Sequence, residues 1–216
     1  MTMERNRSDD KELLGEGGGP HASRAVRGAA LPQPAVTAAL RRAFFREWAA
    51  RGYGALSLER VATRAGVGKA ALYRRWPSKA AMATDLVEGL STSLLAPLDT
   101  GSLRGDARAF LGSLARVLRH PMVRSILPDL HAEAARGSDL APLLMRVAAA
   151  RRARAAAILD RAAVRGELDP ETDRALLLDL MAAPLYWRLV AIGGSASEDD
   201  LDRMADVVAA TAGARP

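Results

Sequence analysis

Alanine is the residue that most restricts what this chain can fold into. It accounts for 45 of the 216 residues, whereas isoleucine occurs only three times. Alanine is the best helix former, while strands favour β-branched and aromatic residues. Because 49% of the residues are hydrophobic, a chain of this length can bury a core without the help of a cofactor. We therefore expect an all-α protein that needs no cofactor.

The absence of cysteine excludes several kinds of site. Disulfides, thiolate zinc sites, iron–sulfur clusters and cysteine nucleophiles all require it. The longest apolar stretches are interrupted by charged residues and fall short of the ~20 apolar residues that span a membrane. The first 20 residues lack the apolar segment of a secretory signal. The sequence predicts a cytoplasmic protein without a membrane partner.

The net charge of +6 is distributed unevenly along the chain. Residues 1–34 hold five basic and five acidic side chains, residues 35–80 hold ten basic and two acidic ones, and residues 81–216 hold 16 and 18. All the excess positive charge therefore lies in one 46-residue block. Such a block is typical of a polyanion-binding module joined to a nearly neutral body.

Glycine and proline divide the chain into three predicted parts. The glycines between Gly15 and Gly19 and the prolines at 20, 32 and 34 predict a disordered tail over residues 1–34. Residues 35–80 are predicted to form the basic domain and residues 81–216 a larger helical domain. Four helices are expected first: one of about 16 residues from Ala35, one capped by Ser57, one over Lys69–Trp76 and one capped by Ser78. Five more are expected at 105–119, 121–136, 139–166, 170–192 and 198–212.

Two local signals mark boundaries within the larger domain. Asp169 followed by Pro170 combines an N-cap side chain with a proline at the first helical position, which predicts a helix start. Pro128, Pro142 and Pro184 fall inside expected helices, so each predicts a kink or an extra boundary.

The basic block contains the pattern of a helix-turn-helix. Two short helices are joined by the turn Gly66-Val67-Gly68. Helical spacing points Leu72 and Trp76 inward together. The expected buried set is Leu58, Val61, Ala65, Val67, Leu72 and Trp76. The opposite side of the second short helix is then left to face the DNA major groove.

Residues 56–82, with the sequence LSLERVATRAGVGKAALYRRWPSKAAM, resemble the tetracycline-repressor (TetR) family of bacterial transcriptional regulators. RGEL at 165–168 and PLYWRLV at 184–190 are similar to a subgroup common in actinobacterial regulators. The resemblance implies an N-terminal DNA-binding domain and a C-terminal helical domain for a small effector. It also implies a homodimer formed mainly by the last two helices.

The same resemblance implies roles for individual residues. Tyr73 and Lys79 match positions that usually contact phosphates, and Thr63 matches a position where a backbone or base contact is common. Gly68 departs from the family, because it stands where serine or threonine usually caps the recognition helix. Small Ala70 and Ala71 suit thymine methyls, whereas Arg74 and Arg75 suit guanine or phosphate. The predicted DNA-binding set is Thr63, Gly68, Lys69, Ala70, Ala71, Tyr73, Arg74, Arg75 and Lys79.

The larger domain is predicted to be a receptor, because its helices carry more apolar surface than one small core needs. The candidate ligand-binding residues are Phe110, Met122, Leu127, His131, Met145, Met181, Tyr186, Trp187 and Arg188, with Asp129 as a further polar anchor. The candidate dimer-interface residues are Met181, Leu185, Leu189, Leu201, Met204 and Val208.

Enzyme and metal motifs are weak. His131 and Glu133 have the spacing of a zinc deaminase, but that site needs cysteines that the chain lacks. We expect neither an enzyme nor a metal site. The leading hypothesis is a repressor that a small-molecule effector releases from a palindromic double-stranded DNA operator. An activator and a helical carrier protein with a nonspecific basic surface are the alternatives.

Overall fold

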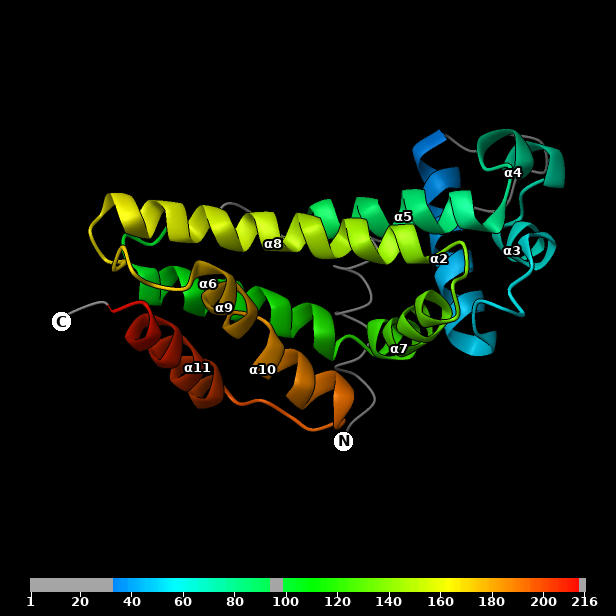
Figure 1. Cartoon of the computed structure of the whole chain (residues 1–216). Coiled ribbons are helices and arrows are strands. Elements are labelled where there is room, and N and C mark those ends of the chain that lie inside the picture. Colours follow the sequence, from blue (N-terminus) through cyan, green and yellow to red (C-terminus); the bar gives the residue numbers. More distant parts are fainter. Residues whose placement is uncertain (1–32, 94–98, 214–216) are drawn as a thin grey trace, which may run out of the picture. The chain divides into compact units, whose positions relative to one another are not determined.

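The computed structural model describes residues 33–93 and 99–213, and its described regular elements are all helical (Figure 1). This confirms the expected all-α fold. The predicted tail lies almost wholly outside the described residues. The chain forms two compact units: one extends to Leu90 and includes Ser125–Leu140, and the other comprises Ser91–Arg124 and the chain from Ala141 onward. The predicted domain boundary after residue 80 falls within the first turn of α5 and stays a prediction.

The first unit begins with four helices: α2 (Gln33–Arg51), α3 (Leu58–Ala65), α4 (Lys69–Arg75) and α5 (Lys79–Ser93). The three- and four-residue spacing of apolar side chains along α2 buries Leu40, Phe44 and Trp48 on one side. The rings of Phe44 and Trp48 meet edge to face, with their centroids 5.7 Å apart. Helix α3 packs on α2, and α4 packs on α3.

The second part of α7 (Pro121–Ala135) belongs to this unit from Ser125 onward and lies beside the end of α2 (Figure 1). Its Asp129 Oδ2 accepts hydrogen bonds from the Trp48 indole nitrogen and the Tyr53 backbone amide, each at 2.7 Å. The Tyr53 hydroxyl lies 3.1 Å from Asp139 Oδ1 and donates to it. Burial and the Asp139 charge raise the pKa of Tyr53, so its hydroxyl remains a donor. Two carboxylates therefore join residues 125–140 to the end of α2.

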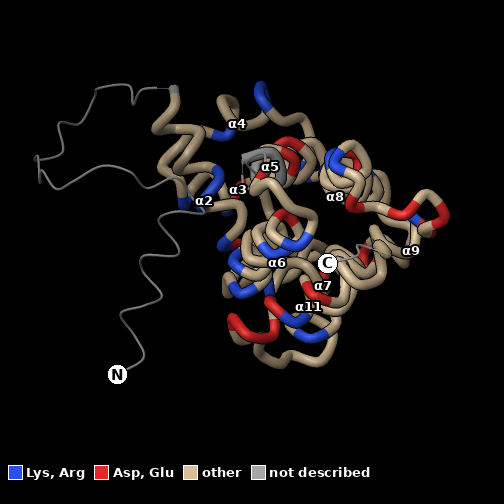
Figure 2. The backbone as a smooth tube through the Cα atoms, turned by 90° about the vertical axis from the view of Figure 1, so that its left-hand side faces the viewer, with Lys and Arg blue, Asp and Glu red and all other residues tan. Residues whose placement is uncertain are grey.

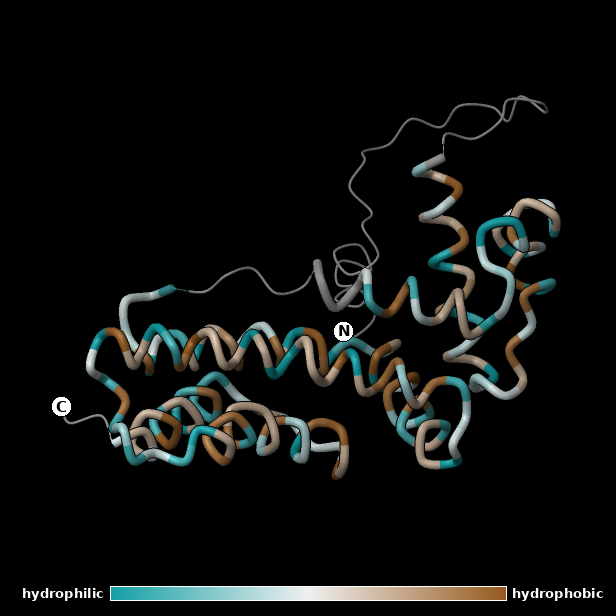
Figure 3. Tube along the Cα trace, turned by 45° about the horizontal axis from the view of Figure 1, so that its top comes forward, coloured by the Kyte–Doolittle hydropathy of each residue, from teal (hydrophilic) through white to brown (hydrophobic). Residues whose placement is uncertain are grey.

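The second unit contains α6 (Leu103–Arg119), α8 (Ala141–Val164), α9 (Arg174–Leu180), α10 (Ala183–Tyr186), the π-helix η1 (Trp187–Ala191) and α11 (Glu198–Thr211). Hydrophobic and hydrophilic segments alternate along α8, as expected of an amphipathic helix (Figure 3). Helix α6 packs against α8, α11 and η1. The core of this unit therefore forms around α6.

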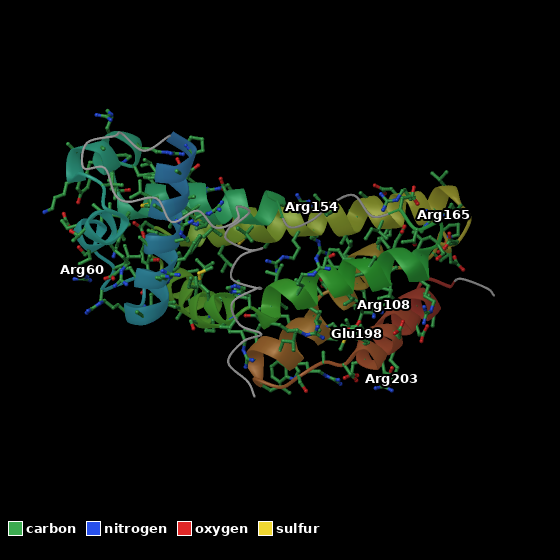
Figure 4. The ribbon with its side chains drawn as sticks, turned by 180° about the vertical axis from the view of Figure 1, so that it is seen from behind. Arg60, Arg108, Arg154, Arg165, Glu198 and Arg203 are labelled. Carbon is green, nitrogen blue, oxygen red and sulfur yellow. The ribbon has the colours of Figure 1, made fainter. Side chains whose placement is uncertain are left out.

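Charged side chains connect α6 to its neighbours at the surface, and Figure 2 shows acidic and basic segments together there. The Arg108 side chain contacts Asp202 at 3.1 Å and also Glu198, with Arg108 and Glu198 labelled in Figure 4. Two residues earlier in α6, buried Asp106 lies 3.3 Å from Arg165 and 3.6 Å from Arg161. Asp106 also accepts a hydrogen bond from the Thr100 amide, so its buried charge is paired.

The single helix predicted over 170–192 is wrong, because the chain forms α9, α10 and η1 there. The helix starts at the N-cap Asp173, whose side chain accepts from the amides of Ala175 and Leu176. The side chain of Asp169 instead accepts the Glu171 amide within a turn. The boundary expected at Pro184 is confirmed, because α10 begins at Ala183, directly before this proline. Pro128 lies inside α7 and marks no helix boundary. No described helix combines the length and apolar character needed to cross a membrane.

Candidate nucleic-acid interface

Helix α4 presents a sharply divided surface. Leu72 and Trp76 are buried as predicted, and the Trp76 indole donates a 2.8 Å hydrogen bond to Asp85 of α5. The other side of the helix is exposed. Its exposed residues are Lys69, Ala70, Ala71, Tyr73, Arg74 and Arg75. Two small and four large hydrogen-bonding side chains thus surround the exposed part of α4, and Leu72 is its one buried residue. Such a helix can present hydrogen-bonding groups to a major groove.

The turn between α3 and α4 orients that face. Ser57 caps α3 by accepting from the Arg60 amide at 3.4 Å, and the helix ends at Gly66 with φ of +68°, a left-handed conformation that favours glycine. The Val67 amide then donates to the Ala62 carbonyl at 3.0 Å. Gly68 is the N-cap of α4 and offers no side-chain hydrogen bond, so amides at this helix start face outward without a capping hydroxyl.

Tyr73 and Thr63 are both exposed, and both hydroxyls have protein partners. The Tyr73 hydroxyl donates to Glu59 Oε1 at 2.7 Å, and the Thr63 hydroxyl donates to the Glu59 carbonyl at 2.9 Å. The hydrogen bonds from Tyr73 and Ser57 lower the pKa of Glu59 from its usual value to about 2. A phosphate that binds the Tyr73 hydroxyl must therefore replace the Glu59 carboxylate as its acceptor.

Lys79 and Arg75 make contacts within the first unit. The Lys79 ammonium donates to the carbonyls of Tyr53 and Gly54 at 2.8 and 3.2 Å, and it lies 4.3 Å from the Tyr53 ring centroid. The Arg75 guanidinium lies 4.5 Å from the Trp76 ring centroid and also donates to Thr37 of α2. These contacts hold the Lys79 ammonium at residues 53–54 and the Arg75 guanidinium at the start of α2.

A shallow groove runs along the flank of the exposed face of α4. It is lined by Val36, Leu40, Val67, Ala71, Arg74 and Arg75. The start of α2 therefore lies next to the recognition helix, and it contributes the apolar Val36 and Leu40 to the groove.

Two family profiles match the chain. Residues 40–86 match the profile described as bacterial regulatory proteins of the tetR family, and residues 97–208 match the profile described as the tetracyclin repressor-like C-terminal domain. The chain belongs to the TetR family. It is a DNA-binding helix-turn-helix transcriptional regulator, and this family is not enzymatic.

Relatives from several bacteria share most of the chain. It is 31% identical over 159 residues to the "DNA-binding transcriptional repressor TetR" of Mycobacteroides abscessus, covering 73% of this chain and 83% of that protein. It is 29% identical over 149 residues to the uncharacterized regulator YdeS of Bacillus subtilis, covering 68% and 75%. The crystal structure of the TetR family regulator SCO0332 has a TM-score of 0.63 at 32% identity, covering 84% of this chain and 99% of that one. The resemblance to actinobacterial regulators is thereby confirmed.

One feature of this TetR family member was not predicted from its sequence. Glu47 of α2 is fully buried and is contacted by three arginines: Arg60, Arg51 at 3.5 Å and Arg64 at 3.7 Å (Arg60 is labelled in Figure 4). Three of the ten basic side chains in residues 35–80 therefore pair with an acid of their own unit. The available signal was the position of Glu47 among the buried aromatic residues of α2.

The predicted ligand-binding residues differ in exposure and belong to both units. Leu127 and His131 are in the first unit and the other seven are in the second. Phe110 and Met181 are buried, Met145 and Trp187 are exposed, and Met122, Leu127, His131, Tyr186 and Arg188 are half-buried. Arg188 forms a 2.7 Å ion pair with Asp200. Asp129, the further anchor, is occupied by Trp48 and Tyr53.

The predicted dimer residues lie mostly inside the single chain. Met181, Leu185, Leu189, Leu201 and Val208 are each at most 3% exposed, and only Met204 is half-buried. The helical spacing identified the apolar stripe of each helix correctly, but the stripe packs within the same chain. Those five residues are therefore core residues of the chain itself.

Proposed function

We propose that this TetR family regulator is a dimeric repressor that a small-molecule effector releases from a palindromic operator. The observation that carries the proposal is the exposed face of α4, where Tyr73, Arg74 and Lys69 surround two alanines while Leu72 and Trp76 anchor the helix from behind. In a symmetric dimer, two such helices would enter successive major grooves about 34 Å apart. We place its activity in the cytoplasm, where bacterial DNA lies.

An effector would act by favouring a different conformation of the dimer. A ligand that prefers the DNA-free state shifts the population toward it, and complete switching from 1:99 to 99:1 needs about 5.5 kcal/mol of preference. Helix α5 follows the recognition helix directly and is the element through which we expect the change to reach α4.

The operator hypothesis is tested by fluorescence anisotropy with DNA that flanks the gene for this protein. We expect Arg74→Ala to weaken binding roughly 10-fold and to reduce the slope of log K against log salt by about 1. Arg174→Ala is the matched control, because Arg174 is an exposed arginine of α9 in the other unit and lies outside the proposed dimer surface. Equal effects of both variants would favour a nonspecific basic surface, as in a carrier protein.

For the dimer, we propose a surface made by exposed apolar residues rather than by the buried stripe. Trp187, Ile192 and Val207 are each more than half exposed, and Met204, three residues before Val207 in α11, is half-buried. Both η1 and α11 pack on α6, which leaves their outer faces available. Such apolar side chains on a surface are typical of an interface between copies. Light scattering should show that Val207→Asp produces monomers, whereas Val164→Asp, at another exposed valine, does not.

A further inference from the structure

Glu59 lies in the first turn of α3, and its carboxylate is held by a hydroxyl on each side of the turn that joins α3 to α4. Its Oε1 accepts a hydrogen bond from Tyr73 of α4 at 2.7 Å, and its Oε2 accepts one from Ser57, the N-cap of α3, at 2.8 Å. The Glu59 side chain is half-buried, and Tyr73 is 40% exposed. An anion of the chain itself thus lies against the exposed face of the recognition helix.

The surroundings of this carboxylate favour a negative charge. The hydrogen bonds from Tyr73 and Ser57 lower the pKa of Glu59 to about 2, and the charge of Lys69 at the start of α4 acts in the same direction. A DNA phosphate is bound by the same kinds of group, namely hydroxyl donors with a cation nearby. The Glu59 carboxylate therefore uses the donor that the family resemblance assigns to a phosphate.

We propose that Glu59 is an internal competitor of the DNA backbone: it occupies the Tyr73 hydroxyl in the free protein and lowers the affinity for every DNA sequence. Binding then exchanges one charge-assisted hydrogen bond of the hydroxyl for another, so the contact of Tyr73 with a phosphate adds little net affinity. The displaced carboxylate stays beside α4 and repels the phosphate that replaced it. The proposal rests on the function proposed above, through that contact of Tyr73.

The competition bears on how the regulator separates its operator from other DNA. Phosphates carry no base identity, so the cost of displacing Glu59 is the same on any duplex. With one backbone contact reduced everywhere, the base contacts expected from Lys69 and Arg74 supply a larger share of the operator affinity. Glu59 thus limits nonspecific binding by a strongly basic surface.

The test is fluorescence anisotropy of the full chain with a short duplex of scrambled sequence, at one fixed salt concentration. Glu59→Gln removes the charged acceptor and should strengthen binding roughly 5- to 10-fold, because a hydrogen bond to a charged group is stronger than one to a neutral group. Tyr73→Phe alone should change the affinity by less than about 3-fold, since the hydroxyl has a charged acceptor in both the free and the bound state. Combined with Tyr73→Phe, Glu59→Gln should add no more than about 2-fold.

Asp139→Asn provides the matched control. Asp139 is also a carboxylate of the first unit that accepts from a tyrosine hydroxyl, that of Tyr53, and this substitution changes the net charge by the same amount. It lies outside the helix-turn-helix and should leave the affinity within about 2-fold. Circular dichroism checks that every variant keeps its helical fold.

Two results would overturn the proposal. Weaker binding by Glu59→Gln would show that the carboxylate contacts DNA directly, as an acceptor for a cytosine amino group does. An equal gain from Glu59→Gln with and without Tyr73→Phe would show simple repulsion, without competition for the hydroxyl.

Failure of the repressor hypothesis gives a different result. If the DNA that flanks the gene binds no more tightly than the scrambled duplex, the operator proposal fails. The gain of Glu59→Gln on the scrambled duplex, and its loss with Tyr73→Phe, would still establish the competition.

Discussion

Replacing Asp129 should cost more stability than replacing any other acid of comparable exposure in the first unit. Its Oδ2 accepts from the Trp48 indole nitrogen and from the Tyr53 amide, each at 2.7 Å. These donors belong to residues that are 1% and 2% exposed, so water cannot readily take the place of the carboxylate. An unsatisfied buried donor costs about 1–3 kcal/mol. For two donors we expect Asp129→Ala to lower the free energy of unfolding by about 3 kcal/mol, and Tm by about 6–12 °C.

Urea denaturation of the full chain at one protein concentration measures this change, since concentration affects the stability of an oligomer. Asp129→Asn keeps an oxygen with two lone pairs and should lose only about 1 kcal/mol. Asp139→Ala is the control, because Asp139 is exposed and accepts one longer hydrogen bond from Tyr53. Hydrogen exchange adds a local readout: the Tyr53 amide should lose protection in Asp129→Ala and keep it in Asp129→Asn. A stability of Asp129→Ala within 1 kcal/mol of the original chain would refute the argument that these donors depend on the carboxylate.

Three further changes test individual contacts. Glu47→Gln should lower the free energy of unfolding by about 1–3 kcal/mol in urea denaturation, because it removes the charge that Arg60 and two other arginines share; an unchanged midpoint would contradict this. Glu59 has a folded-state pKa of about 2, below its usual 4.5, so its contribution to stability is present above about pH 4.5 and is lost as the pH falls toward 2. Glu59→Gln should flatten the fall of Tm over that pH range, and a parallel fall in both proteins would argue against the bond to Tyr73. Gly66→Ala should cost about 1–2 kcal/mol in thermal unfolding through its positive φ alone, since no atom lies within 4 Å of the added carbon; a cost near zero would show that the turn relaxes.

Features that depend on neighbours in the sequence could be predicted well. The inward positions of Leu72 and Trp76 follow from helical spacing, and the turn at Gly66 follows from the conformational freedom of glycine. The helix boundary at Pro184 could also be predicted from the sequence, because proline lacks the amide hydrogen that would continue a helix. The helix start predicted at Asp169 was wrong. Asp169 and Asp173 are four residues apart and can both cap a helix, but Asp169 accepts the Glu171 amide within a turn, and the helix begins after Asp173.

By itself, the sequence determined the all-helical fold, the basic helix-turn-helix and the membership of the TetR family, because composition, helical periodicity and motif order are carried by residues close together in the chain. Only the tertiary structure decided which partner each side chain meets. It placed Asp129 against Trp48, gathered three arginines on Glu47 and buried the apolar stripe of α11 within the same chain. The physical reason is that helical periodicity predicts which residues lie on the same side of a helix. The side chains that pack against that side come from segments tens of residues away in the sequence, and periodicity does not identify them.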